Sequence, residues 1–286
     1  MAAKLLKGIT VVKAMEAGLS ARAKALAAVC PKLAIARVGG RPDDETYERG
    51  AIKRCESVGI KCETHVFERS VSNREFLRAL NLLSSDGAVH GVLVMSPLPA
   101  SIDRAAVRAA IDPEKDVDCM GGVNSAKLFE GDLSGHAPCT PSAVLEMLRF
   151  FKIPISGSRV TIVGRSLVVG KPLAMLLLAE NATVTICHTR TVDLEAECRR
   201  ADILIAAAGK ASMIGAGHIK PGAAVIDVGV NAGDDGVLRG DVDFEAASAL
   251  AGHITPVPGG VGTVTPAILA RNTLDACERL LTARPR

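Results

Sequence analysis

The stretch RVTIVGRSLVVGKPLAMLLLAENATVTICHTR, from Arg159 to Arg190, decides the fold. Its β-branched apolar run at 160–163 ends at Gly164, which predicts a buried strand of a parallel sheet followed by a sharp turn. Gly170 then opens a helix, and the run at 183–187 is typical of a second strand. Because the amino terminus of such a helix can bind a phosphate, this strand–turn–helix–strand pattern predicts a dinucleotide site.

The end of the second strand indicates which dinucleotide is bound. Enzymes that use NAD usually have an Asp or Glu there, which accepts a hydrogen bond from the ribose 2′-hydroxyl. Here the position holds His188, Thr189 and Arg190. Because Arg165 and Arg190 can donate to a 2′-phosphate, the sequence favours NADP over NAD. The turn is GxSxxxG instead of G-x-G-x-x-G, so a purely structural turn and an ordinary surface arginine are the alternatives.

Composition indicates a globular protein of two domains. The chain has 286 residues, of which 48% are hydrophobic, enough for two cores. Its 34 basic and 31 acidic residues are not arranged in blocks, and it has one Tyr, six Phe and no Trp, so we expect no nucleic-acid partner. We expect no membrane partner, because no apolar stretch approaches the roughly 18 residues of a spanning helix.

The eight cysteines show no CxxC spacing, and most of them lie in apolar runs. They therefore predict no metal site, and free thiols of this kind are typical of a reducing compartment. Lys4, Lys7 and Lys13 interrupt the amino-terminal segment, which argues against a secretion signal. We expect a cytoplasmic protein.

Strands and helices alternate along the chain. Helices are predicted at 10–30, 43–57, 72–84, 102–110, 141–151 and 266–283, and strands at 33–39, 60–67, 91–99, 159–164, 183–188, 202–208, 223–229 and 253–258. This alternation is typical of parallel sheets, and the glycine-rich segment 112–140 predicts an irregular crossing between two domains. We expect an α/β fold in which residues 1–140, with the C-terminal helix 266–286, form one domain. Residues 141–265 are expected to form a Rossmann-like parallel-sheet domain that binds NADP.

Four further segments carry a family resemblance. They are YERGAIKRCESVGI at 47–60, DPEKDVDCMGGVNSAKL at 112–128, HAPCTP at 136–141 and ITPVPGGVGTVTPAILARNT at 254–273. Together with VGRSLVVGKP, they resemble the methylenetetrahydrofolate dehydrogenase/methenyltetrahydrofolate cyclohydrolase family from about Leu5 to Leu281. The resemblance implies an NADP-dependent oxidoreductase of one-carbon metabolism that acts on tetrahydrofolate derivatives. It also implies two α/β domains facing each other across a cleft, usually in a homodimer formed through the cofactor domains.

The same resemblance implies the site residues, to which the argument from the strand end adds Arg190. The cofactor-binding residues are Thr140, Gly164, Arg165, Ser166, Thr189, Arg190, Val230 and Thr263. The substrate-binding residues are Tyr47, Met95, Asp118, Pro258, Gly259 and Gly260, and Tyr47 and Asp118 are also the candidate catalytic residues. A carboxylate suits the pterin because the ring edge offers an amino group and an N–H side by side. The alternative for Asp118 is an acid that caps a helix or turn.

The chain departs from this family at the cyclohydrolase signature. The family has a tyrosine followed four residues later by a lysine, a serine three residues before the tyrosine, and a glutamine in GxLVQLPLP. Here Tyr47 is kept, whereas Ala51 stands at the lysine position, Asp44 at the serine position and Met95 at the glutamine position. Lys53 lies six residues after Tyr47, on a different face of a helix, so it is no obvious substitute.

Chemistry indicates which activity such changes affect. Hydride transfer from a methylene carbon needs mainly orientation of donor and acceptor, whereas hydrolysis of the methenyl cation needs activated water and proton transfers. We therefore expect a methylenetetrahydrofolate dehydrogenase with weak or absent cyclohydrolase activity. The alternatives are the full bifunctional enzyme that forms 10-formyltetrahydrofolate, a non-catalytic folate- or nucleotide-binding paralogue, and a dehydrogenase for another small substrate.

Overall fold

The computed structural model describes residues 3–233 and 235–283, and the chain divides into two compact units. Unit 1 contains the described residues up to Lys13 together with Thr140–Thr265. Unit 2 contains Ala14–Cys139 and the described residues from Pro266 onward. The last three residues of the predicted C-terminal helix, 284–286, lie outside the described residues.

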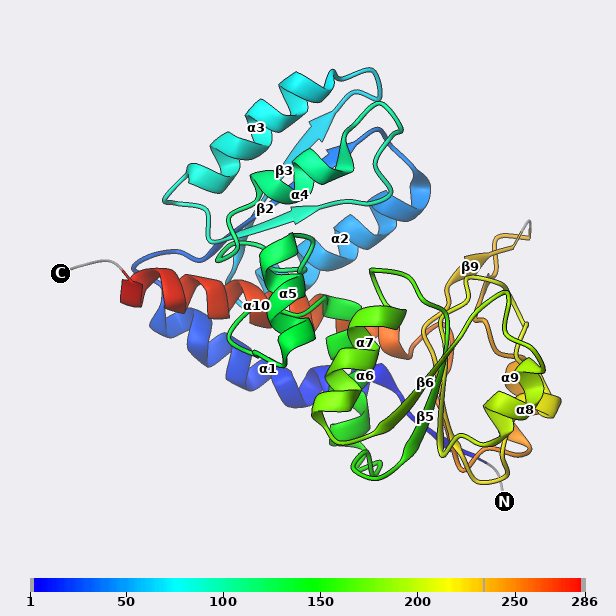
Figure 1. The fold of residues 1–286 in the computed structure, drawn as a ribbon. Coiled ribbons are helices and arrows are strands. Elements are labelled where there is room, and N and C mark those ends of the chain that lie inside the picture. The colour runs from blue at the N-terminus through cyan, green and yellow to red at the C-terminus, as the bar shows by residue number, and fades with distance from the viewer. Residues whose placement is uncertain (1–2, 234, 284–286) are drawn as a thin grey trace. The chain divides into compact units, whose positions relative to one another are not determined.

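Unit 1 is built on a parallel sheet of six strands, in the order β1-β11-β8-β7-β5-β6 (Figure 1). The strands are β1 (Lys4–Leu5), β5 (Arg159–Val163), β6 (Thr183–Cys187), β7 (Ile203–Ala206), β8 (Ala224–Asp227) and β11 (His253–Ile254). Its helices are α6 (Cys139–Phe150), α7 (Gly170–Ala179), α8 (Leu194–Arg199), α9 (Phe244–Ser248) and the 3-10 turn η1 (Ala216–His218). A short antiparallel pair, β9 (Asn231–Ala232) and β10 (Leu238–Arg239), completes it. The predicted α/β fold with a Rossmann-like parallel sheet is confirmed.

The strand order locates a binding edge in this sheet. β7 and β8 are buried along their whole length, as expected for apolar strands covered on both faces. β5 pairs with β6 on one side and with β7 on the other, so the direction of winding reverses next to β5. Open parallel sheets bind ligands at the carboxyl ends of the strands at this reversal, which here is the end of β5.

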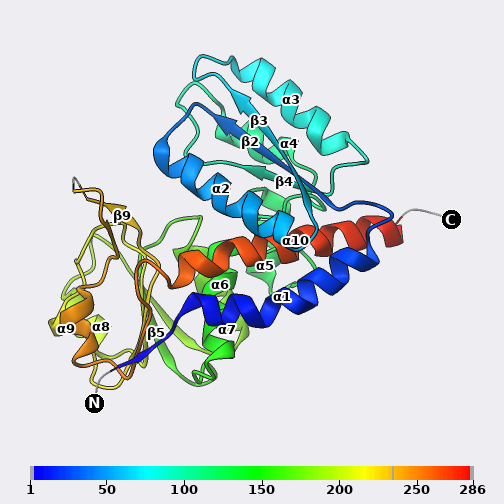
Figure 2. The same cartoon turned by 180° about the vertical axis from the view of Figure 1, so that it is seen from behind.

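Unit 2 has a parallel sheet of three strands in the order β3-β2-β4. The strands are β2 (Lys32–Val38), β3 (Lys61–Phe67) and β4 (Gly91–Val94), and the helices are α2 (Pro42–Ser57), α3 (Asn73–Ser85), α4 (Arg104–Ala110) and α5 (Gly122–Glu130). Helix α1 (Gly8–Ala25) joins this unit from Ala14, and α10 (Val261–Ala283) joins it from Pro266. The two helices lie side by side in both views (Figures 1 and 2). Arg22 of α1 forms ion pairs with Asp275 at 2.5 Å and Glu278 at 2.8 Å, both on α10.

Two sequence predictions about the segments between units were wrong. Residues up to Lys13 do not belong with the rest of 1–140, because β1 pairs with β11 and becomes an edge strand of the six-stranded sheet. The segment 112–140 is not irregular throughout, because it contains α5. Gly131 is the C-cap of that helix, with a left-handed φ of 78°, and its N–H donates to the carbonyl oxygen of Leu128 at 3.3 Å. This glycine therefore terminates a helix and does not indicate an irregular segment.

The other predicted elements agree with the structure in type, but some bounds differ. The predicted strand 253–258 is limited to β11, and α10 begins at Val261, five residues before Pro266. Among the described helices, none combines the length and the apolar character needed to cross a membrane.

Candidate functional site

The turn after β5 brings backbone atoms too close together for any side chain. Gly164 has a φ of 134°, and a Cβ on it would lie 2.1 Å from the carbonyl oxygen of Ala207. A Cβ on Gly170 would lie 2.1 Å from the carbonyl oxygen of Gly164. The two predicted glycines therefore form a tight turn of bare backbone at the carboxyl end of β5, called the glycine cradle below, and glycine turns at this place are typical of dinucleotide-binding sheets.

The first turn of α7 faces this cradle. Val169, at the N-cap, makes no side-chain capping bond, and its own N–H donates to Ser166 Oγ at 3.0 Å. Arg165 and Ser166 are exposed in the loop between β5 and α7. The positive end of the helix and an exposed guanidinium thus lie on the same loop, which suits a phosphorylated ligand.

The end of β6 forms a tight turn that presents the predicted 2′-phosphate residues. The N–H of His188 donates to Thr191 Oγ1 at 2.8 Å, and the N–H of Arg190 donates to His188 Nδ1 at 3.2 Å. Thr189 and Arg190 are exposed at its tip. The next acid, Asp193, accepts from the N–H of Ala196 at 3.1 Å as the N-cap of α8. No carboxylate occupies residues 188–191, which fits a 2′-phosphate better than a free 2′-hydroxyl.

Two buried aspartates that sequence reasoning missed shape the loops beyond β7 and β8. Asp241 is fully buried and accepts from three successive N–H groups at 208–210, at 2.6 to 2.9 Å. Asp227 accepts from the N–H groups of Gly229, Asp241 and Val242 at 2.9 to 3.0 Å, while burial raises its pKa to about 6. Predicted Val230 follows Gly229 and is 59% exposed. The sequence did offer a signal for these two residues. Each is an acid in a short glycine-containing segment, DVGVN at 227–231 and GDVD at 240–243, and Asp227 ends β8.

The predicted PGG segment is also a backbone feature of unit 1. Gly259 has a φ of 104°, and its carbonyl oxygen accepts from the N–H of Gly8 at 2.8 Å. A Cβ on Gly260 would lie 2.5 Å from the carbonyl oxygen of Pro256. Thr263 donates from its N–H to the carbonyl oxygen of Gly260 at 3.1 Å. The segment 258–260 therefore belongs to the same unit as the glycine cradle.

In unit 2 the structure brings Tyr47 and Asp118 together around Cys139. The N–H of Cys139 donates to Asp118 Oδ1 at 2.8 Å, and its thiol donates to the carbonyl oxygen of Val117 at 3.5 Å. Burial raises the pKa of Asp118, and the hydrogen bond from the Cys139 N–H acts against this rise. Burial, with the nearby Asp118, raises the pKa of Tyr47 well above its ordinary value. Tyr47 is therefore a phenol that can donate a hydrogen bond next to a carboxyl.

Cys139 was missed as a site residue, although HAPCTP was noted as a motif. Predicted Thr140 follows it in α6 and begins the second segment of unit 1, Thr140–Thr265.

The inner face of α2 continues from Tyr47 through Ala51 and Cys55. These positions are four residues apart and so share one helix face, and Ala51 and Cys55 are fully buried. Lys53 is exposed, which agrees with its expected place on another face. Met95 is buried directly after β4 and donates from its N–H to the carbonyl oxygen of Ala36 at 2.9 Å. No lysine takes part in this face of α2.

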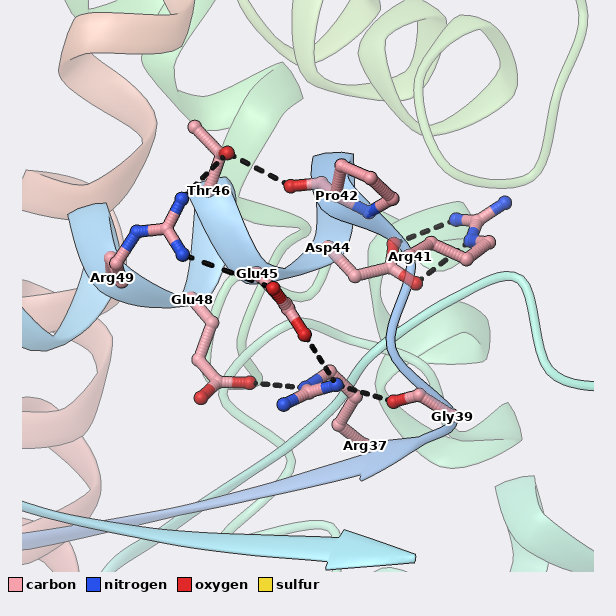
Figure 3. A network of polar contacts seen from close by, with 9 residues as sticks. All are labelled: Arg37, Gly39, Arg41, Pro42, Asp44, Glu45, Thr46, Glu48 and Arg49. Carbon is pink, nitrogen blue, oxygen red and sulfur yellow. Dashed lines mark hydrogen bonds and ion pairs between the residues drawn. The ribbon is translucent and has the colours of Figure 1, made fainter. Parts of the chain in front are cut away.

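Asp44 is buried and engaged in an ion pair. Arg41 donates to its two carboxylate oxygens at 2.6 and 2.8 Å (Figure 3). One turn along, Arg37 Nε donates to Glu48 Oε2 at 2.7 Å, with both side chains 11% exposed. The acid at the serine position of the signature is thus held by an arginine.

The two units define a class of protein: a two-unit α/β protein with a dinucleotide-binding sheet. Two family models match it in order along the chain. The "Tetrahydrofolate dehydrogenase/cyclohydrolase, catalytic domain" matches residues 6–118, and the "Tetrahydrofolate dehydrogenase/cyclohydrolase, NAD(P)-binding domain" matches residues 138–281. The chain belongs to the tetrahydrofolate dehydrogenase/cyclohydrolase family.

Individual relatives are similar over nearly the whole length. The Bifunctional protein FolD of Alkaliphilus oremlandii is 46% identical over 276 residues, covering 96% of this chain and 97% of the relative. The solved bifunctional FolD of Campylobacter jejuni superposes with a TM-score of 0.94 at 37% identity, covering 97% of this chain and 99% of that one. The Trypanosoma brucei methylenetetrahydrofolate dehydrogenase-cyclohydrolase was solved with NADP and an inhibitor. It superposes with a TM-score of 0.94 at 36% identity, covering 99% of this chain and 100% of that one.

Proposed function

We propose that this chain oxidises 5,10-methylenetetrahydrofolate to 5,10-methenyltetrahydrofolate, with NADP as the hydride acceptor. The observation that carries the proposal is the match of both family domains in order, at residues 6–118 and 138–281. The bare-backbone cradle at Gly164 and Gly170 fits a dinucleotide, and the related Trypanosoma brucei enzyme was solved with NADP. We assign cofactor binding to unit 1 and the folate-binding catalytic role to unit 2.

The residues that would hold NADP are backbone and basic groups of unit 1. We assign Gly164, Arg165 and Ser166 to the phosphates, Thr189 and Arg190 to the 2′-phosphate, and Val230, Thr140 and Thr263 to the nicotinamide end. When bound, NADP supplies an acceptor for the hydride. The chain's own part is to orient the two ligands and to exclude water, which is most of what this reaction requires.

We assign folate binding to the predicted substrate-binding residues. Asp118 accepts from the amino group and the ring N–H of the pterin, and the phenol of Tyr47, whose pKa is raised further by burial, donates a hydrogen bond. Met95 contributes apolar surface, and backbone at Pro258, Gly259 and Gly260 approaches the ligand closely. The nitrogen lone pairs of the substrate stabilise the cation that forms as the hydride leaves.

Hydrolysis of the methenyl product is the second candidate function. Relatives named bifunctional favour it over our expectation of weak or absent cyclohydrolase activity. The residues that remain for acid–base work are Tyr47 and Asp118, because Ala51 carries no ionisable group and Asp44 is paired with Arg41. A bifunctional enzyme would have to activate water without the signature lysine.

The test is to supply methylenetetrahydrofolate with NADP or NAD and to follow the methenyl and formyl products separately. We expect NADP-dependent formation of methenyltetrahydrofolate, at least about tenfold faster than with NAD. Hydrolysis above the spontaneous rate establishes the bifunctional enzyme, whereas methenyl accumulation establishes the dehydrogenase alone. A protein that forms neither product refutes the proposal.

Asp118→Ala separates the two ligands. We expect it to lose folate binding while NADP binding persists, because Asp118 belongs to unit 2 and the cradle to unit 1. Separate titrations with tetrahydrofolate and NADP measure this. Unchanged folate affinity removes Asp118 from the site.

We also infer a cytoplasmic homodimer formed through the cofactor-binding units. The support is the family resemblance and the free cysteines of the described residues. Sedimentation of the purified protein gives its oligomeric state, and a monomer at micromolar concentration contradicts this inference.

A further inference from the structure

The loop after β7 is held by two different partners. Ala207 donates from its N–H to the carbonyl oxygen of Val163 at 2.8 Å, which ties the start of the loop to β5. The next three N–H groups, at 208–210, donate to Asp241: the first two reach Oδ2 at 2.6 and 2.9 Å, and the third reaches Oδ1 at 2.9 Å. The glycine cradle, where Gly164 meets the Ala207 carbonyl, therefore depends on β5, whereas the loop beyond it depends on Asp241.

The same carboxylate contacts the loop after β8 on both sides of Val230. Asn231 donates from its side-chain amide to Asp241 Oδ1 at 2.9 Å. A Cβ on Gly229 would lie 2.2 Å from Asp241 Cγ, so the backbone at Gly229 lies directly against the carboxyl group. Both neighbours of Val230 thus rest on Asp241, while Val230 itself is 59% exposed.

Asp227 fixes the backbone of Asp241. Its Oδ1 accepts from the N–H groups of Gly229 at 2.9 Å and Asp241 at 3.0 Å, and its Oδ2 accepts from the N–H of Val242 at 2.9 Å. A Cβ on Gly240 would lie 1.9 Å from Asp227 Oδ2, which leaves no room for a side chain. Asp241 is fully buried, so its carboxylate is a fixed acceptor for the loops around it.

The loops that Asp241 holds leave the sheet on the side of the glycine cradle. β5, β7 and β8 are parallel and adjacent, so their carboxyl ends lie at one edge of the sheet. Open parallel sheets bind their ligands at this edge. Asp241 thus links two loops, 208–210 and 229–231, at the edge to which we assign the dinucleotide.

We propose that Asp241 is a positioning residue for the nicotinamide half of NADP, which it orients by holding residues 208–210 and the loop of Val230 in place. This inference rests on the proposed function. The adenosine half is assigned to the glycine cradle and to Thr189 and Arg190, whereas the partners of Asp241 lie in the two loops after β7 and β8. Because hydride transfer depends on orientation, a displacement of about 1 Å can lower its rate by about a hundredfold.

Asp241→Asn is the direct test. The amide keeps the size of the side chain but turns one acceptor oxygen into an NH2 group that faces N–H donors, so part of the network is lost. NADP and 2′,5′-ADP, which has the adenosine half and no nicotinamide, are titrated separately, and formation of methenyltetrahydrofolate is followed with NADP. We expect kcat to fall by about tenfold or more and NADP affinity by about fivefold. The affinity for 2′,5′-ADP should stay within about twofold of the unmodified value, whereas general loosening of unit 1 would weaken both ligands.

Asn231→Ala is a second variant that keeps the buried carboxylate and removes one of its donors, so it tests the proposal even if Asp241→Asn does not fold. We expect the same pattern, with kcat and NADP affinity lower by about threefold. Asp202→Asn is the matched control. Asp202 accepts from the N–H of Arg159 at 2.9 Å and from Lys220 Nζ at 2.6 Å, at the start of β5 and β7 and therefore at the opposite edge of the sheet. This control should leave all three measurements within about twofold.

Two results would overturn the proposal. One is a kcat and an NADP affinity that neither Asp241→Asn nor Asn231→Ala changes, and the other is an equal loss of NADP and 2′,5′-ADP affinity. An unmodified protein that binds NADP but forms no methenyltetrahydrofolate contradicts the proposed function instead, and the two titrations then still decide whether Asp241 positions the nicotinamide half.

Discussion

The turn between β5 and α7 and the Tyr47 face of α2 form their candidate sites by different means. At the turn, carbonyl groups approach Gly164 and Gly170 so closely that a Cβ would lie 2.1 Å from an oxygen, so the turn depends on bare backbone. On α2 the surface consists of side chains at positions 47, 51 and 55, which can change while the helix persists. A backbone site therefore limits the sequence strictly, whereas a side-chain site can be altered within an unchanged fold.

The largest effect is expected from Gly170→Ala, which breaks the backbone site. The new methyl group would have to displace the Gly164 carbonyl, so we expect loss of NADP binding and a loss of about 4 kcal/mol or more in the free energy of unfolding. Gly215→Ala in the same unit is the matched control, since its Cβ would meet no atom within 4 Å. NADP titration and urea unfolding measure both. Normal NADP affinity in Gly170→Ala would mean that the cradle tolerates a side chain.

Arg37→Met tests how α2 is held beside the side-chain site. It leaves the Glu48 carboxylate, 11% exposed, without its guanidinium, so we expect unfolding in urea to be easier by about 3 kcal/mol. The double variant Arg37→Met with Glu48→Met should recover most of this loss, because no buried charge then remains unpaired. If the double variant is as unstable as Arg37→Met alone, the ion pair is not what holds the helix.

His136→Phe concerns the segment that leads to Cys139. His136 is buried, its Nε2 has no hydrogen-bond partner among the described residues, and burial lowers its pKa to about 4. The unfolded chain, with an ordinary pKa of about 6.5, binds the proton first, so this group destabilises the fold as the pH falls from 6.5 towards 4. Through this group the free energy of unfolding should fall by about 2 kcal/mol between pH 7 and pH 5, and His136→Phe should not show this fall. Unfolding curves at the two pH values measure this, and an unchanged difference between them would contradict it.

The smallest effect is expected from Ser166→Ala, a side-chain change inside the backbone site. It removes the Ser166 Oγ acceptor of the Val169 N–H, and we expect NADP affinity to fall by about fivefold, equivalent to roughly 1 kcal/mol. Ser248→Ala in α9, whose hydroxyl donates to the Phe244 carbonyl, is the control and should bind NADP normally. A loss as large as that of Gly170→Ala would show that the turn depends on side chains after all.

The sequence predicts the backbone turn after β5 better than the side-chain site on α2. The strands β5 and β6 and the glycine turn are local patterns, and their predicted positions agree with the structure to within about one residue. The closeness of Tyr47, Asp118 and Cys139 is a tertiary fact, and Tyr47 and Asp118 were identified only through the family resemblance. The loop role of Asp241 depends on N–H groups about thirty positions earlier in the chain, at 208–210. The two residues of β1 form a strand only because β11 offers a free edge.

The pairing of β1 with β11 has a consequence for synthesis on the ribosome. The first strand to be made, Lys4–Leu5, pairs with His253–Ile254, and Arg22 of α1 binds residues of α10, the last helix. Each unit therefore contains an early segment that must wait for a late one, and neither can close while the middle of the chain is being translated. The edge of β8 that β11 covers stays open until His253 and Ile254 have been made, and an open strand edge can pair with other chains.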